Sequence, residues 1–199
     1  EQTNVVVSGQ VTDIEPTNTA SVTFTDESGT PVTITNVTIN NDGSWEVSSA
    51  DINTLADGTI TAAVSVFDDA GNQATNSTTF EKDTQASISI PSENNDLLIN
   101  NAEKSAVVIN GQSANIEEGK IVNVMVSDGT KTVTGQATIL ADGTWQSNSL
   151  DLTTLDEGEL TVSATTADTA GNTANADLNI DKDTQSAVTV NVGDDAVIN

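Results

Sequence analysis

Cysteine and histidine are absent from this chain of 199 residues, and aromatic residues make up only 3% of it. Without cysteine there is no disulfide, so stability outside a cell has to come from packing or from metal bound through oxygen. Without thiolate and imidazole ligands, structural zinc and most copper sites are excluded. The scarcity of aromatic rings also argues against a surface built to stack on sugars.

Positive charge is scarce as well. The chain has 30 acidic and 5 basic residues, with a formal net charge of −25. This balance excludes nucleic-acid binding through phosphate contacts and argues against an anionic membrane surface. No apolar run approaches the roughly 18 residues of a membrane span, and the N-terminus carries no signal peptide. We therefore expect no nucleic-acid partner and no direct membrane insertion, but an affinity for cations.

Groups for catalysis are also missing. The chain has no histidine, no cysteine and no serine paired with a base. A hydrolase built on two carboxylates is formally open, but every notable carboxylate falls in a loop that occurs twice. A duplicated loop is a poor active site, so we expect that the protein is not an enzyme.

What the chain does contain is a repeat with a period of 100 residues. The recurring pairs are Trp45 and Trp145, Asp68–Asn72 and Asp168–Asn172, and Glu81–Gln85 and Asp181–Gln185. A solenoid unit runs about 20–50 residues, so this period fits a whole small domain. The sequence therefore predicts an array of like domains.

The repeat divides the chain into three parts. Residues 1–82 form one repeat whose first strand is missing or supplied elsewhere, and residues 83–182 form a complete second repeat. Residues 183–199 resemble the first strand and loop of a third repeat, because residues 186–199 resemble 86–100 and both close with Ile-Asn. We expect the chain to be a segment of a longer tandem array.

Alternation of apolar and polar residues predicts β-strands throughout. Val122, Val124 and Val126 alternate with polar residues, as do Leu160 and Val162, and no segment has a helical period. The breaks carry turn residues, with Asp-Gly at 42, 57, 128 and 142. The strands predicted for the second repeat are 86–91, 105–112, 120–127, 131–139, 143–149, 159–166 and 173–180. Seven short strands in about 100 residues predict an all-β chain of two tandem immunoglobulin-like β-sandwiches.

The motifs also carry a family resemblance. Asp142–Trp145, Leu155–Val162, Ala167–Ala174 and Asp181–Thr184 resemble the bacterial Ig-like repeats in the extender regions of large RTX-type adhesins, which Gram-negative bacteria export by type I secretion. The resemblance implies secreted, rod-like repeats, stiffened by Ca²⁺ at their junctions, that project an adhesive tip from the cell surface. The family often has proline shortly after the junction aspartate, whereas Gln85-Ala86 stands here, which implies a softer hinge.

This resemblance sets the expected function and partners. We expect a structural extender, or stalk, of a cell-surface adhesin that serves cell adhesion or biofilm formation. Its partners would be the neighbouring repeats of the same polypeptide, the protein would be a monomer, and the adhesion ligand would bind elsewhere in the full protein. The alternative is a ligand- or glycan-binding Ig-like module, which exposed aromatic residues in a concavity would favour. Trp45 and Trp145, each after an Asp-Gly turn, are better explained as core residues.

Acidic residues gather at the predicted junction between the repeats. In an Ig sandwich the last strand ends at the pole that carries the AB, CD and EF loops, and the next domain begins at its opposite pole, beside its BC and FG loops. The candidate ligands at this junction are Glu1, Asp26, Glu27, Asp57, Glu81 and Asp83 from the first repeat and Glu117, Glu118, Asp168 and Asn172 from the second. Equivalent positions elsewhere add Asp68, Glu103, Asp128, Glu157, Asp181 and Asp183, with Asp194 and Asp195 in the third-repeat loop.

Ca²⁺ is the cation that suits such a set. It takes six to eight oxygen ligands at roughly 2.3–2.6 Å and tolerates irregular geometry, whereas Mg²⁺ demands a tight octahedron. Asp83 in the linker and Asp168 are the expected bridging pair. The opposing interpretation is that acidic loop residues are simply solvated.

Overall fold

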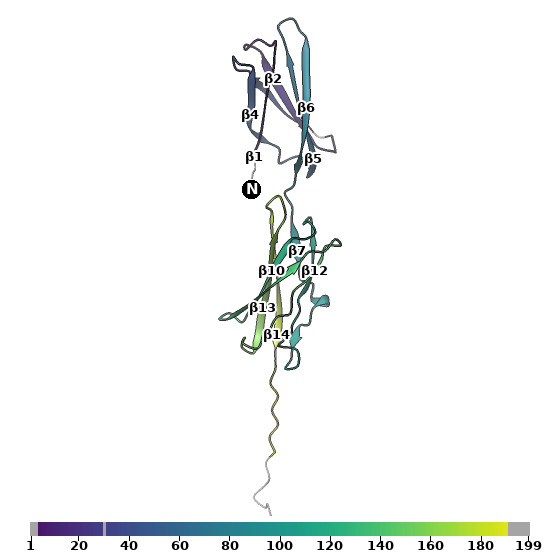
Figure 1. The fold of residues 1–199 in the computed structure, drawn as a ribbon, viewed down its shortest axis with the longest axis vertical. Helices are drawn as coiled ribbons and strands as arrows, with labels where there is room; N and C mark the ends of the chain where they lie inside the picture. The colour runs from purple at the N-terminus through teal and green to yellow at the C-terminus, as the bar shows by residue number, and fades with distance from the viewer. Residues whose placement is uncertain (1–3, 30, 191–199) are drawn as a thin grey trace, which may run out of the picture. The chain divides into compact units, whose positions relative to one another are not determined.

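The computed structural model describes residues 4–29 and 31–190, and the chain divides into two compact units, Glu1–Thr84 and Gln85–Asn199. In each unit the described strands form two layers (Figure 1). Apart from the three-residue 3-10 helix η1 (Ser92–Asn94), every regular element in the described ranges is a β-strand. Within those ranges no helix is long and apolar enough to cross a membrane. The predicted all-β class with two immunoglobulin-like sandwiches is confirmed.

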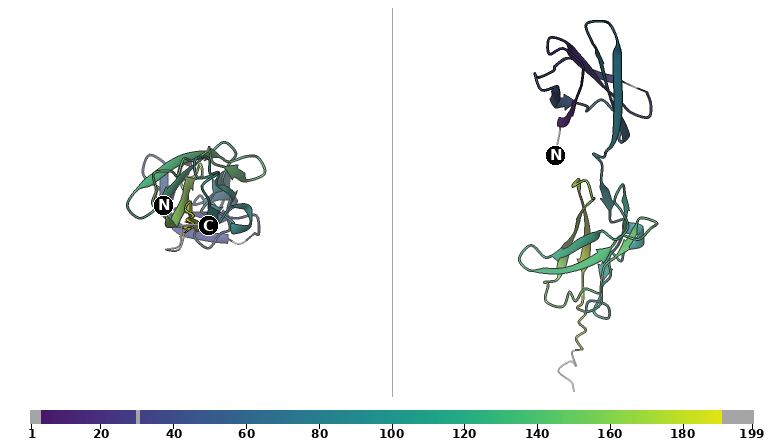
Figure 2. Two further views of the ribbon diagram at one scale, coloured as in Figure 1. Left: turned by 90° about the horizontal axis from the view of Figure 1, so that it is seen from below. Right: turned by 45° about the horizontal axis from the view of Figure 1, so that its top comes forward.

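In unit 1, residues 4–29 and 31–84 form six strands in two sheets. The strands are β1 (Asn4–Gln10), β2 (Thr19–Thr25), β3 (Pro31–Thr38), β4 (Ser44–Asp51), β5 (Gly58–Phe67) and β6 (Gln73–Lys82). One sheet has the order β3-β2-β5-β6, and its β5–β6 hairpin can be followed in Figure 2. The other sheet pairs β1 with β4. The alternating side of β2 puts Ala20, Val22 and Phe24 into the core between the sheets.

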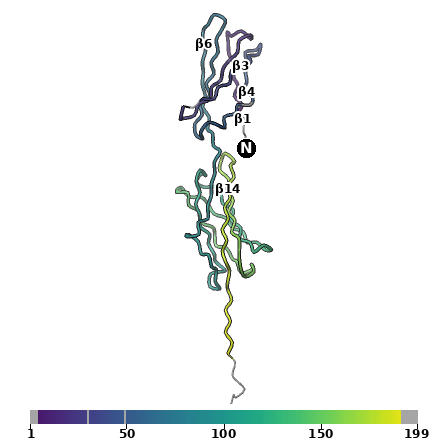
Figure 3. Tube along the Cα trace, turned by 180° about the vertical axis from the view of Figure 1, so that it is seen from behind, coloured from purple at the N-terminus to yellow at the C-terminus, as the bar shows by residue number. Residues whose placement is uncertain are grey.

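The described part of unit 2, up to residue 190, contains eight strands. They are β7 (Ser87–Ser89), β8 (Leu98–Ile99), β9 (Asn110–Ala114), β10 (Ile121–Ser127), β11 (Thr132–Thr138), β12 (Thr144–Gln146), β13 (Gly158–Ala167) and β14 (Thr173–Lys182). One sheet has the order β12-β9-β7 and the other β11-β10-β13-β14-β8. The segment before β9 therefore contributes first to one sheet and then to the other, with Pro91 between the two strands. After β14, residues 183–190 lead away from the sheets of unit 2 as an extended segment (Figure 3).

Each of the seven strands predicted for the second repeat has an observed counterpart. The last two agree to within two residues at each end, since β13 and β14 carry the longest alternations. The predicted 105–112 strand is shorter, because only Asn110 onward joins a ladder and Val107 forms an isolated bridge with Leu150. The predicted 143–149 strand ends as β12 at Gln146. The parallel strand β8 was not predicted.

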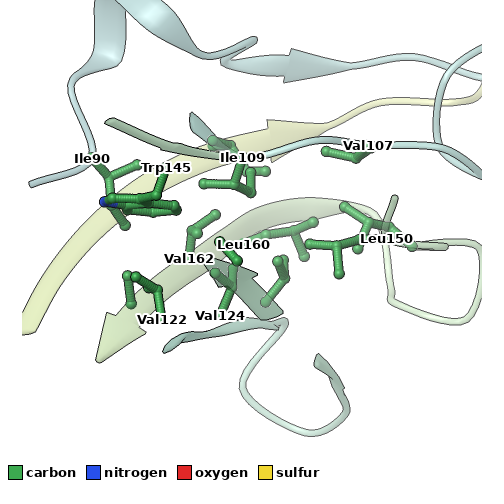
Figure 4. Packing of buried hydrophobic residues seen from close by; sticks show 14 of the residues in the cluster. Ile90, Val107, Ile109, Val122, Val124, Trp145, Leu150, Leu160 and Val162 are labelled. Carbon is green, nitrogen blue, oxygen red and sulfur yellow. The ribbon is translucent and has the colours of Figure 1, made fainter. Parts of the chain in front are cut away.

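The core of unit 2 fills the space between its two sheets (Figure 4). Trp145 is 2% exposed and lies beside Ile90 at one end of this core. A Cβ on Gly111, its cross-strand partner, would lie 2.0 Å from the indole carbon Cζ2 of Trp145. Glycine is therefore required there. Trp45 and Gly9 repeat the pairing in unit 1, with Trp45 6% exposed, so the prediction of two core tryptophans is confirmed.

Candidate functional site

The end of each unit at which its last strand leaves, here called the exit pole, is held by a lysine. In unit 2, the side chain of Lys182 at the end of β14 is 3% exposed. Its Nζ donates to the Leu155 carbonyl and lies 3.4 Å from Oε1 of Glu157. An ammonium group leaves water at tolerable cost only where acceptors of this kind replace the water. The lysine thus ties β14 to the loop before β13.

The threonine two residues later completes the arrangement in unit 2. Thr184 donates its backbone N–H and its hydroxyl to the two oxygens of Glu157, each at 2.7 Å. The pKa of Glu157 is lowered, first by the N–H of Thr184, then by its hydroxyl and by Lys182. We call such a set of lysine, carboxylate and threonine an exit latch. It fixes the first two residues of the chain beyond β14.

Unit 1 has the same exit latch with aspartate in place of glutamate. Nζ of Lys82 donates to the Leu55 carbonyl at 2.9 Å and to Oδ1 of Asp57 at 3.0 Å. Thr84 donates its N–H to Oδ2 of Asp57 at 3.0 Å and its hydroxyl at 2.9 Å. Partial burial of Asp57 opposes its ionisation, but the bonds from Lys82 and Thr84 outweigh it and lower its pKa. Asp57 and Glu157, both predicted metal ligands, are therefore ionised partners of a lysine.

A second carboxylate at each exit pole joins the CD loop to the EF loop. In unit 1, Oδ2 of Asp26 accepts the N–H of Ala56 at 2.9 Å, while Oδ1 accepts from Ser28. In unit 2, Oδ2 of Asp128 accepts the N–H of Asp156 at 2.8 Å. That N–H, with those of Lys131 and Thr130, lowers the pKa of Asp128 well below its usual range. These bonds bring the predicted CD and EF loops together at the pole where β6 and β14 end.

Three further candidates at the exit poles are Glu103, Glu81 and Asp83. Oε1 of Glu103 accepts the N–H of Asn100 at 2.7 Å, and Oε1 of Glu81 accepts the hydroxyl of Thr59 at 2.7 Å. Asp83 is exposed in the linker after β6. Three predicted positions, Glu1, Asp194 and Asp195, lie outside the described residues.

Asp181 and Asp183 contribute through their backbone. Their N–H groups donate to the carbonyls of Leu97 at 2.8 Å and Ile99 at 3.0 Å, which joins β14 to β8. The side chain of Asp183 accepts the N–H of Gln185 at 3.2 Å. These two aspartates thus hold the parallel strand pair at the exit pole.

At the opposite, entry pole of unit 2, Asp168 organises the FG loop. It is 4% exposed, and its Oδ1 accepts the N–H groups of Gly171 and Asn172 at 2.7 and 2.8 Å. Its Oδ2 accepts the side-chain N–H of Asn172 at 2.7 Å. Burial raises the pKa of Asp168, but these bonds outweigh it and leave the pKa lowered.

The same loop recurs in unit 1, and in each unit a glutamate accepts a backbone N–H of the loop. Asn72 donates to Asp68 at 2.7 Å and lowers its pKa. Glu117 accepts the N–H of Thr169 at 3.0 Å, and Glu15 accepts the N–H of Asp69 at 3.2 Å. Two further candidates, Glu27 and Glu118, are exposed.

The chemistry of this donor set suits a hard cation, but each unit taken by itself does not assemble a metal site. Among residues 4–29 and 31–190, no three acidic side chains lie close enough together to hold a metal ion. The lowered pKa values of Asp57, Asp168 and Glu157 keep these oxygens charged at neutral pH. Each already accepts bonds that shape its own loop. Bridging of Asp83 and Asp168 by Ca²⁺ stays a prediction.

Sequence reasoning missed the two latch lysines. The chain has five basic residues, all lysine, and two of them, Lys82 and Lys182, occupy equivalent positions 100 residues apart. Conspicuous repetition of a rare residue was the signal that could have found them. The repeated Leu55 and Leu155 supply the carbonyls that these lysines bind.

The ligand-binding alternative finds little support in the described surface. Both tryptophans are in the cores and cannot stack on a sugar. A shallow open groove lies across β10, β11 and β13, and its lining side chains are aliphatic, amide, hydroxyl and thioether groups without an aromatic ring. Its lining residues are Asn123, Val124, Met125, Thr134, Gly135, Gln136, Asn148, Ser163 and Thr165.

Comparison with known proteins identifies both repeats. A family model described as "Bacterial Ig-like domain" matches residues 3–84 and 93–184. Curated protein sequences give no significant match. A crystal structure of a tetra-tandem repeat from the extending region of a large adhesion protein is 27% identical, with a TM-score of 0.44 over 92% of this chain and 46% of the other.

Two further solved structures are similar over 92% of this chain. One, concerned with host cell surface retention of a 1.5-MDa bacterial ice-binding adhesin, is 25% identical over 59% of its chain, with a TM-score of 0.46. The other is described as a Ca²⁺-stabilized adhesin that helps an Antarctic bacterium reach out and bind ice; it is 24% identical over 45% of its chain, with a TM-score of 0.42. The chain thus spans about half the length of these structures.

Proposed function

Because this chain belongs to the bacterial Ig-like domain family over both of its repeats, we propose that it is a structural extender segment of a bacterial cell-surface adhesin. Its work is mechanical: it spaces an adhesive tip, located elsewhere in the polypeptide, from the cell. Two repeats with the same exit latch favour this function over one that needs a unique site.

The observation that carries the proposal is the parallel pairing of β8 with β14. The chain enters unit 2 through the segment that contains β8 and leaves it at the end of β14. Because the two strands are parallel, pulling the ends of the unit apart slides them against each other. The bonds from Asp181 to Leu97 and from Asp183 to Ile99 are then loaded together rather than one after another. This geometry suits a domain that carries tension along the chain.

The exit latch adds to this resistance. Lys182 and Thr184 fasten the last residues of β14 to Glu157 and to the Leu155 carbonyl. Tension on the linker has to break these charge-assisted bonds before it reaches the end of the strand. The same bonds fix the direction in which the chain leaves the unit.

We further propose that Ca²⁺ stiffens the linker between the repeats. Its ligands would be oxygens of Asp83 with the exit-pole residues of unit 1 and of Asp168, Asn172 and Glu118 in the entry-pole loops of unit 2. A linker held only by the chain samples many angles, and a cation bound by both repeats would remove that freedom. Ion binding offsets the entropy cost of ordering one hinge.

Small-angle X-ray scattering with and without Ca²⁺ tests this function. We expect a larger maximum dimension and a narrower distance distribution in millimolar Ca²⁺ than in chelator, with an unchanged β-sheet signal in circular dichroism. Asp83→Ala should abolish the difference, whereas Glu46→Ala, which removes an exposed carboxylate on β4, should retain it. Equal scattering in both conditions would reject Ca²⁺ stiffening and leave the acidic loops as a solvated surface.

Force spectroscopy tests the mechanical part separately. Unit 2 should unfold at high force when pulled from its two ends. Replacing Ile99 by proline removes pairing of β8 with β14 and should lower that force, whereas proline at exposed Ser92, in η1, should not. Low unfolding force in the unaltered chain would contradict the extender function whatever the effect of Ca²⁺.

A further inference from the structure

The strand β11 in unit 2 has an open backbone edge. It lies at one end of its sheet and pairs with β10 on one side only. On the other side, the N–H of Gln136 donates to Oδ1 of Asn148 at 2.7 Å, and its carbonyl accepts the N–H of Asn148 at 2.9 Å. Among the described residues, no strand pairs with this edge before Gln136. Both sequence neighbours of β11, β10 and β12, are described, so the open edge belongs to the fold of unit 2 itself.

The alternation of the backbone shows which groups are open. Successive residues of an antiparallel strand direct their N–H and carbonyl groups to opposite sides. The carbonyl of Lys131 accepts the N–H of Asp128 on the β10 side, whereas Gln136 bonds to the outer side. Thr132 and Thr134 alternate in step with Gln136, so their backbone groups point outward. The edge therefore offers two donors and two acceptors to a further strand.

Unit 1 closes the equivalent edge. The pairing of β3 with β2 matches that of β11 with β10, and it makes Pro31 the counterpart of Thr132 and Thr33 the counterpart of Thr134. Proline has no N–H to donate, and proline at such a position protects an edge strand from pairing. Further along β3, a bulge with Asn36 at φ 59° breaks the register. β11 has no proline, and its register with β10 is regular.

We infer that the open edge of β11 pairs with the same edge in a second copy of this chain. Antiparallel pairing centred on Val133 places Thr132 of each copy opposite Thr134 of the other. Each of these two pairs exchanges both of its N–H···O bonds, so four hydrogen bonds form and satisfy every open group. The contact is isologous and closes as a dimer, in which the two five-stranded sheets continue into each other.

Charge favours a second copy as the occupant. Residues 132–136 carry no charged side chain, so two such edges meet without repulsion between them. The charge at the start of the edge is Lys131, which is paired with Asp156 and is opposite in sign to the net charge of −25 on the approaching copy. An antiparallel partner has to present an open, uncharged edge of its own, and a second copy supplies one by symmetry.

The neighbouring side chains add apolar contact. Met125, the cross-strand partner of Thr134, is 39% exposed, whereas its counterpart in unit 1 is Thr23. Methionine is enriched at protein interfaces, and charged residues are depleted from their centres. A contact of four hydrogen bonds is nevertheless small, so a single pair of copies binds weakly. Extenders displayed side by side, a step that rests on the proposed function, would add such contacts along their arrays. This differs from the monomer expected from the sequence.

Sedimentation velocity of the 199-residue chain tests the proposal. The average mass should rise toward that of a dimer with protein concentration, and more steeply in about 0.5 M than in about 0.05 M NaCl, because salt screens the net charge. Thr132→Pro removes two of the four hydrogen bonds and should weaken association about tenfold or more. Thr132→Ala keeps the N–H and should associate nearly as strongly as the unaltered chain. A monomer at all concentrations and salts would leave the edge to solvent or to another protein and would overturn the proposal.

A second pair of variants keeps the backbone donors and changes charge. Thr134→Asp places a carboxylate on each of the paired edges and should weaken association. Thr33→Asp makes the same change at the counterpart in unit 1 and should leave association unchanged. Equal weakening by both variants would overturn the assignment to β11. Circular dichroism checks that each variant is folded. None of these measurements involves Ca²⁺ or force, so their failure would leave the extender function standing.

Disulfide capture tests the register, because the chain has no cysteine of its own. Cα atoms of a hydrogen-bonded antiparallel pair lie about 5.5 Å apart, within the range of a disulfide. Thr132→Cys mixed with Thr134→Cys should therefore give a crosslinked dimer of the two under mild oxidation. Each variant alone should crosslink far less, since like residues are displaced by two positions and lie about 7–8 Å apart. Equal yields from the mixture and from either variant alone would overturn the antiparallel register.

Discussion

At the scale of single residues, the most telling feature is that a lysine stands at the end of the last strand of each unit. Two of the chain's five basic residues are Lys82 and Lys182, and each is largely buried against a carbonyl and a carboxylate. The Lys182 side chain is 3% exposed, and its ammonium group is held by the Leu155 carbonyl and by Glu157. The lysine can therefore stay buried only while the chain after β14 keeps the path that Glu157 and Leu155 impose.

Removing the buried ammonium should destabilise unit 2. Lys182→Met keeps the length of the side chain but leaves the Leu155 carbonyl without its donor, which should cost about 1–3 kcal/mol in the free energy of unfolding. Lys131→Met removes an exposed ion pair with Asp156, which water screens, and should cost less than Lys182→Met. Denaturant titration followed by Trp145 fluorescence measures both. Equal losses would mean that the latch contributes no more than a surface ion pair.

Acid should weaken unit 2 in part through Asp128. Its pKa is lowered in the folded state, chiefly by the N–H groups of Asp156 and Lys131, so folding favours its ionised form. The stability it contributes is present above the unfolded pKa of about 3.9 and is lost as the pH falls further. Between pH 5 and pH 2, the denaturation midpoint should fall less in Asp128→Asn than in the unaltered chain. Glu93→Gln, in η1, is the charge-matched control, and the same flattening there would point to net charge instead.

At the scale of elements, the alternation of apolar and polar residues predicted the long strands. It did not predict a very short strand, nor the end of a strand at which a side chain replaces the backbone as hydrogen-bond partner. β8 has only two residues, too few for a period to be recognised, and its parallel pairing with β14 depends on tertiary contacts. β12 ends at Gln146, and at the next position the Ser147 N–H still donates to the Ile109 carbonyl at 2.8 Å, but Oγ of Ser147 accepts the Ile109 N–H at 3.0 Å. A hydroxyl that accepts a backbone hydrogen bond in place of a carbonyl does not change the alternation of apolar and polar residues, so the sequence does not reveal it.

The sequence also predicted where the loops lie, but it did not predict the hydrogen bonds that their carboxylates make. Topology alone brings the CD and EF loops to one pole, and Asp26 and Asp128 lie there as expected. That these carboxylates accept backbone N–H groups of the neighbouring loop depends on the turn geometry of both loops. The sequence reports only that an acidic residue is present.

The glycine beneath each tryptophan gives a matched pair of tests at this scale. In Gly111→Ala the new Cβ would lie 2.0 Å from Trp145 and 2.4 Å from the Ser89 carbonyl of β7, so backbone has to move. In Gly9→Ala the nearest atom is 2.8 Å away, on Trp45. Overpacking lowers the free energy of unfolding by about 1–3 kcal/mol. We expect the loss for Gly111→Ala to reach the upper end of this range or exceed it, and the loss for Gly9→Ala to be smaller. Thermal unfolding monitored by each tryptophan compares them, and the reverse order would contradict the close packing of β7 against β9.

At the scale of the whole molecule, the two units should differ in stability. Unit 1 leaves Val64 and Phe80 only partly buried, where unit 2 has Ala164 fully buried and Ile180 3% exposed. Each square ångström of apolar surface left in water forgoes about 25 cal/mol. At low protein concentration, we expect two thermal transitions with unit 1 unfolding first. Trp45→Phe and Trp145→Phe variants assign each fluorescence transition to its unit, and a single shared transition would show that the units unfold together.

The position of the latch lysines also decides what proteases can do to this molecule. A protease that cleaves after basic residues finds no arginine here and five lysines, two of them at the ends of β6 and β14. The side chains of Lys82 and Lys182 are 11% and 3% exposed, so the peptide bonds at which such an enzyme would separate one repeat from the next are shielded while the latch is closed. Cleavage there requires local opening, and its rate reports how often that opening occurs. The lysine that closes each exit latch is thus also the residue at which such a protease would have to cut, and the closed latch protects it.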